Sequence, residues 1–116
     1  MAPKEEIIRF LKQFQDKKRI WQIVFRDDRG KNSKTLSELE IIPNQRIEII
    51  DNLKHTDYTE GPLEEKLNKG AEMWVFGKML KGKEIYIKIS MGVAATAPVI
   101  CISFHIAEKA MFYPYK

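Results

Sequence analysis

The chain has 116 residues, a length typical of one compact domain that buries its own hydrophobic core. Its net charge of +4 is compatible with an anionic partner, and its single cysteine excludes an intramolecular disulfide and a cysteine-based zinc site. Because no apolar run reaches the length of a membrane span and no signal peptide is evident, we expect a cytoplasmic protein that makes no membrane contact.

The chain begins with an amphipathic pattern. Residues 4–18 place Ile7, Leu11 and Phe14 on one stripe at helical spacing, which predicts a helix. Residues 20–26 are apolar and β-branched, which favours a strand, although the start of a second helical region has the same composition.

Two further helices are expected before the middle of the chain. Residues 27–32 have the composition of a turn. Thr35 and Glu38 have the spacing of a capping box, which predicts a short helix that starts at Thr35 and ends before Pro43. A second helix is expected over about 43–53, because proline suits a first helical position.

Three stretches read as irregular. Residues 57–62 form a connection, and the polar residues 63–71 are expected to form a mobile loop. Residues 106–116 form a C-terminal extension in which Tyr113-Pro114-Tyr115 argues against a regular helix.

A β-hairpin over about 73–90 is the strongest signal in the sequence. Its second half alternates between apolar Ile85, Ile87 and Ile89 and polar residues, the period of a strand with one buried face. Lys81-Gly82 is a suitable two-residue turn, because glycine adopts positive φ without steric cost.

This turn fixes a register that can be read from the sequence. Gly77 then lies opposite Tyr86, Phe76 opposite Ile87 and Trp74 opposite Ile89, and opposed residues share a face. Lys78 falls on the core side, so its ammonium group must reach the rim of the sheet or the turn must be longer.

A third run, residues 99–105, has the same period of two. Ile100, Ile102 and Phe104 form its apolar side, whereas Cys101, Ser103 and His105 face the other way. The expected core combines these strands with the helices, and it consists of Ile7, Leu11, Phe14, Ile47, Ile50, Ile85, Ile87, Ile89, Ile100, Ile102 and Phe104.

The order of the elements predicts an α+β domain. Helices over about 1–58 precede the mainly antiparallel strands of about 72–105, so the helices should cover one face of a small sheet. The other face would be partly open. Alternation places Tyr86, Lys88 and His105 on that open face.

These three side chains suit phosphodiester chemistry. A lysine holds a phosphate and stabilises its charge, a histidine transfers protons near neutrality, and a tyrosine donates a hydrogen bond or relays a proton. The structural alternative is the solvent-facing half of an ordinary amphipathic sheet. Lys78 and Tyr58 are weaker candidates for contacts with phosphate and with a base, and Tyr58 also suits a packing role. The dispersed histidines and carboxylates predict no metal site and no cofactor.

The hairpin and the third strand resemble the C-terminal half of the motility quorum-sensing regulator (MqsR) toxins. The similarity spans roughly residues 20–105, and its specific part is the Tyr86-x-Lys88 strand and the Ser103-Phe104 strand end. These toxins are bacterial ribonucleases related to the RelE toxins. The resemblance therefore implies a RelE-like fold, metal-independent cleavage of messenger RNA, and a cognate antitoxin encoded by a neighbouring gene.

The chain also departs from the family pattern. His105 stands where the family has a lysine, Val75 stands where it has a glutamine, and residues 106–116 continue beyond the point where the pattern stops. These differences bear on how RNA is cleaved and which sequence is preferred. A non-catalytic α+β domain that binds a nucleic acid or a protein through the same face is the alternative function.

Overall fold

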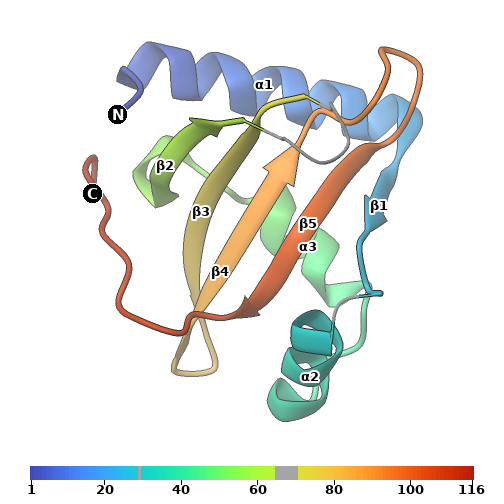
Figure 1. The fold of residues 1–116 in the computed structure, drawn as a ribbon, viewed down its shortest axis with the longest axis vertical. Helices are drawn as coiled ribbons and strands as arrows, with labels where there is room; N and C mark the ends of the chain where they lie inside the picture. Colours follow the sequence, from blue (N-terminus) through green and yellow to red (C-terminus); the bar gives the residue numbers. More distant parts are fainter. Residues whose placement is uncertain (29, 65–70) are drawn as a thin grey trace.

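The computed structural model describes residues 1–28, 30–64 and 71–116, and it shows an α+β fold with one five-stranded sheet (Figure 1). The elements are α1 (Lys4–Trp21), β1 (Ile23–Phe25), α2 (Gly30–Leu39), α3 (Gln45–Asp51), the 3₁₀ helix η1 (His55–Asp57), β2 (Tyr58–Leu63), β3 (Met73–Leu80), β4 (Lys83–Ser90) and β5 (Val99–Ile106). The strand order is β1-β5-β4-β3-β2, in which only the β1–β5 pairing is parallel. The predicted fold class is therefore confirmed.

Helix α1 supplies much of the core on one face of the sheet. Its apolar stripe buries Ile7 and Phe14 completely, and the Phe10 ring stacks on Trp74 of β3 at a centroid distance of 4.6 Å. In Figure 1, α1 and α3 both lie behind the sheet as drawn. We call the opposite face, which is turned toward the viewer, the open face.

The hairpin forms in the predicted register. Trp74 pairs with Ile89, Phe76 with Ile87 and Gly77 with Tyr86. The turn residues Lys81 and Gly82 have φ angles of 51° and 78°, as expected for a two-residue turn that matches the twist of the strands.

The third strand differs from its prediction because β5 contains a bulge. Lys88 pairs with Ser103 but Ile89 pairs with Cys101, so Ile102 is an extra residue and the alternation shifts by one. Cys101 therefore lies in the core and not on the open face, and Ile100 is only half-buried. Ile47 of α3 is likewise half-buried, whereas the other expected core residues are buried.

The boundaries of the first strand and the second helix were predicted wrongly. Ile20 and Trp21 belong to α1, so the strand expected over 20–26 shortens to Ile23–Phe25. Helix α2 begins at Gly30, inside the expected turn, and Thr35 lies in its middle instead of capping its start. Thr35 is buried, and its Oγ1 accepts a hydrogen bond from the Ile106 N–H.

The expected connection at 57–62 is instead the edge strand β2, Tyr58–Leu63. Its pairing with β3 is irregular, with register shifts on both sides of Glu60, and Pro62 sits near its end. The expected loop 63–71 falls mostly outside the described residues. Among the residues that the structure describes, no helix is long and apolar enough to cross a membrane.

Candidate functional site on the open face of the sheet

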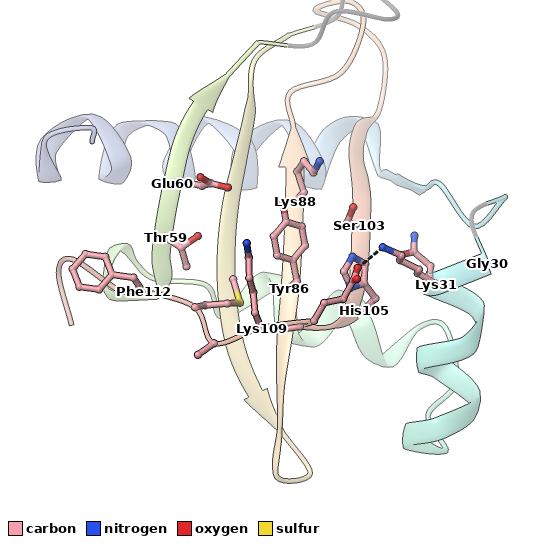
Figure 2. A pocket seen from close by; sticks show the side chains of 15 residues that line it. Gly30, Lys31, Thr59, Glu60, Tyr86, Lys88, Ser103, His105, Lys109 and Phe112 are labelled. Atoms are coloured by element: carbon pink, nitrogen blue, oxygen red, sulfur yellow. Dashed lines mark hydrogen bonds and ion pairs between the residues drawn. The ribbon is translucent and has the colours of Figure 1, made fainter.

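A depression of about 1000 Å³ lies on the open face (Figure 2). Its floor is formed by β4 and β5, its walls by the start of α2 and by residues 107–112 of the C-terminal extension, and Thr59 and Glu60 of β2 line its far end. The three residues predicted as catalytic, Tyr86, Lys88 and His105, all line it.

Tyr86 and His105 are directly opposed in the β4–β5 ladder. Their rings stack with centroids 5.1 Å apart and planes 13° from parallel. The Lys88 Nζ lies 5.9 Å from the centroid of the Tyr86 ring, and Lys88 is itself opposed to Ser103. An ammonium group, a phenol and an imidazole are thus held together on rigid strands, which is the placement that a precise site needs.

Helix α2 fixes the segment of β5 that carries His105. Asn32 is fully buried; its Nδ2 donates to the carbonyls of Arg26 and Ile102, and its Oδ1 accepts from the Phe104 N–H. Beyond it, the Thr35 hydroxyl accepts from the Ile106 N–H. These side chains take the place of a neighbouring strand where β1 has ended, so the backbone on both sides of His105 is held.

The Tyr86 hydroxyl is kept in its neutral form. Partial burial raises the pKa of Tyr86 above its ordinary value, and the nearby Glu60 carboxylate raises it further. Both causes disfavour the phenolate. Tyr86 is therefore available as a hydrogen-bond donor at neutral pH.

The His105 ring is oriented by the backbone. Its Nδ1 lies 3.0 Å from the Ile106 carbonyl oxygen. In the neutral ring, a proton on Nδ1 donates to this carbonyl, which leaves Nε2 with a lone pair. This tautomer is the one in which Nε2 accepts a proton.

Two further lysines line the depression, Lys31 at the start of α2 and Lys109 in the segment 107–112. Lys31 forms an ion pair with Glu108, and the hydrogen bond that the Lys31 ammonium group donates in this pair lowers the pKa of the Glu108 carboxyl. Lys109 is exposed and lies on the wall that residues 107–112 form. Together with Lys88, these cations favour an anionic ligand, although Glu60 and Glu108 moderate the field.

Lys78 and Tyr58 are not brought to this site. Lys78 lies on the core side of β3, where its Nζ pairs with Asp57 at 3.0 Å. Tyr58 is fully buried, and its hydroxyl donates to the Gly61 carbonyl, so it is a packing residue rather than a surface for a base.

The C-terminal wall of the site was missed in the sequence. We call residues 107–116 the strap, because they cross the open face. Gly77 has no side chain, and Tyr113 fills the space above it, next to Tyr86. A Cβ atom on Gly77 would lie 2.2 Å from the Tyr113 hydroxyl. Gly77 is the one sequence feature that could have indicated the strap, because a glycine in a central strand often marks the close approach of another group.

Among the residues that the structure describes, the site contains neither a cluster of metal ligands nor an exposed thiol. Over the ranges 1–28, 30–64 and 71–116, no group of three or more His, Cys, Asp and Glu side chains is placed to hold a metal ion. Complete burial raises the pKa of Cys101 to about 12, so this thiol is a core residue and a poor nucleophile.

Comparison of the chain with protein-family models, with curated proteins and with solved structures found no match. The resemblance to the MqsR toxins therefore stays a prediction from the residues of the hairpin and the third strand. The chemistry of the open face is the basis on which a function can be assigned.

Proposed function

We propose that the chain is a metal-independent endoribonuclease that cleaves single-stranded messenger RNA and acts as the toxin of a bacterial toxin–antitoxin pair. The observation that carries the proposal is the gathering of Tyr86, Lys88 and His105 in one open depression. The cognate antitoxin would be a separate protein encoded by a neighbouring gene.

In the proposed reaction, His105 is the general base. Its Nε2 takes the proton of a ribose 2′-OH, and the 2′ oxygen attacks the adjacent phosphorus. The P–O bond to the 5′ oxygen of the next nucleotide breaks, which leaves a 2′,3′-cyclic phosphate and a 5′-hydroxyl. The contact of Nδ1 with the Ile106 carbonyl supports this role, because it leaves the lone pair on Nε2.

Tyr86 is assigned as the acid that protonates the departing 5′ oxygen. The raised pKa of Tyr86 keeps the phenol protonated before the reaction. An alkoxide is a stronger base than a phenolate, so the phenol still gives up its proton to the leaving group. His105 and Tyr86 thus divide the two proton transfers between them.

Lys88 is assigned to the phosphate. The transition state carries additional negative charge on the non-bridging oxygens, and a fixed ammonium group stabilises that charge. Lys88 comes from the same strand as Tyr86, two residues on, so both side chains reach one phosphate from the same face.

The proposal is tested with the purified protein and a labelled single-stranded RNA. We expect cleavage in the presence of a chelator, with a 2′,3′-cyclic phosphate and a 5′-hydroxyl on the products. Expression of the protein alone should arrest bacterial growth, and co-expression with the neighbouring reading frame should restore it. A folded protein that leaves RNA intact and growth unaffected would contradict the proposal and would favour the non-catalytic binding domain.

Replacing Lys88 with alanine should weaken binding of RNA and make it less sensitive to salt. One lost phosphate contact lowers the slope of log K against log salt concentration by about 0.7 for a single strand. The measurement is fluorescence anisotropy of an uncleavable 2′-O-methyl RNA over a series of salt concentrations. Lys12→Ala is the matched control, because Lys12 is an exposed lysine on α1. An unchanged slope in the Lys88 variant would show that Lys88 does not contact phosphate.

A further inference from the structure

The strap is held by one carboxylate near the tip of the hairpin. Glu84 accepts a hydrogen bond at Oε1 from the Met111 N–H at 3.1 Å and at Oε2 from the Tyr113 hydroxyl at 2.8 Å. The Glu84 carbonyl oxygen also accepts from the Ala107 N–H at 2.8 Å. A single residue of β4 thus fixes the strap at its start and after its middle.

Beyond this point, the strap is anchored in the core. The Tyr115 hydroxyl donates to the Ala2 carbonyl at 2.6 Å, and its ring packs 6.1 Å from the Tyr58 ring. Tyr113 occupies the space above Gly77 on the open face. The strap therefore crosses the open face and then reaches the core, with a half-buried tyrosine at each stage.

Phe112 lies between these anchors and is itself 75% exposed. A single exposed apolar side chain is common on a protein surface. This ring, however, lines the depression and stands on a backbone that its neighbours Met111 and Tyr113 hold in place. Figure 2 shows Phe112 on the β2 side of the site and Lys31 on the α2 side, with Tyr86 and Lys88 between them.

We infer that Phe112 is a stacking platform for one unpaired base of the RNA strand. The inference rests on the proposed function and adds the path of the strand, which crosses the sheet from the α2 side to the β2 side. An aromatic ring held on a fixed backbone loses little conformational freedom when a base stacks on it. Every base has a π face, so this contact selects unpaired nucleotides without selecting a sequence.

The test compares Phe112→Ala with the wild-type protein in binding to 2′-O-methyl RNA that contains bases and to an abasic strand of the same length. Loss of one stacked base should weaken binding of the base-containing strand roughly 5- to 150-fold. Binding of the abasic strand should not change. Phe112→Trp should bind as tightly as the wild type, because a larger ring still stacks.

Val93→Ala is the matched control, since Val93 is an apolar side chain exposed to 70% outside the depression. Wild-type affinity of Phe112→Ala for the base-containing strand would overturn the inference, as would an equal loss for both strands or no binding of RNA by the wild type. The cleavage assay reports on the proposed function separately. Base-dependent binding through Phe112 without cleavage would uphold the platform and remove the ribonuclease.

Discussion

Replacing His105 with alanine is expected to slow RNA cleavage by roughly 10²–10⁴-fold, the usual cost of removing a positioned acid or base. The His105 side chain is half-buried and stacks on Tyr86, and it is not part of the hydrophobic core. The variant should therefore fold, and its affinity for uncleavable RNA should stay close to that of the wild type. The measurement is the single-turnover rate of cleavage of a labelled RNA at saturating protein.

His55→Ala is the matched control for this prediction. His55 is the other histidine of the chain, and it lies in η1, outside the depression. Its replacement should leave the cleavage rate unchanged. A folded His105→Ala protein that cleaves at the wild-type rate would remove the general base from the mechanism and, with it, the main support for catalysis on this face.

Replacing Phe104 with alanine is expected to destabilise the protein by roughly 3–5 kcal/mol. The Phe104 side chain is completely buried and lies opposite Ile87, in the layer between the sheet and the helices. Its removal leaves a cavity that this packed layer cannot fill. Because the free energy of unfolding of a small domain is about 5–15 kcal/mol, the loss is a large fraction of the total.

Urea denaturation followed by far-UV circular dichroism measures this change. Val93→Ala should alter the free energy of unfolding by no more than about 0.5 kcal/mol, because its side chain is exposed. A Phe104→Ala protein that unfolds at nearly the same urea concentration as the wild type would mean that the core is centred elsewhere.

The hairpin was predictable because two independent signals agree. The alternation of Ile85, Ile87 and Ile89 defines a face, and Lys81-Gly82 defines the turn. Together they leave one register, and that register places Tyr86 and Lys88 on the open face. At these two positions, the alternation of buried and exposed residues along the strand was enough to predict the candidate site.

The bulge in β5 was not predictable from the same alternation. Residues 99–104 are apolar or small at nearly every position, so a shift by one residue leaves the pattern equally acceptable. In the observed register, the buried amide of Asn32, which belongs to α2, forms hydrogen bonds with the backbone of Ile102 and Phe104. Such a tertiary contact has no signature in the local sequence.

Strand β2 and the strap were missed for a related reason. Gly61-Pro62 is typical of a connection, yet proline is tolerated in an edge strand. The sequence of the strap shows neither the period of a helix nor that of a strand. Its position depends on single contacts of Tyr113 and Tyr115 with distant residues. The wall of the site that it forms could therefore be found only from the structure.

The side chains of Asn32 and Thr35 also have a consequence for self-association. An unpaired strand edge is a template on which a second chain adds a strand of its own. Here β1 spans only Ile23–Phe25, and beyond it the β5 backbone groups at Ile102, Phe104 and Ile106 are occupied by Asn32 and Thr35. At the opposite edge, β2 is interrupted by register shifts and by Pro62. Both margins of the sheet are thus poor templates for edge-to-edge aggregation, even while one of its broad faces stays open.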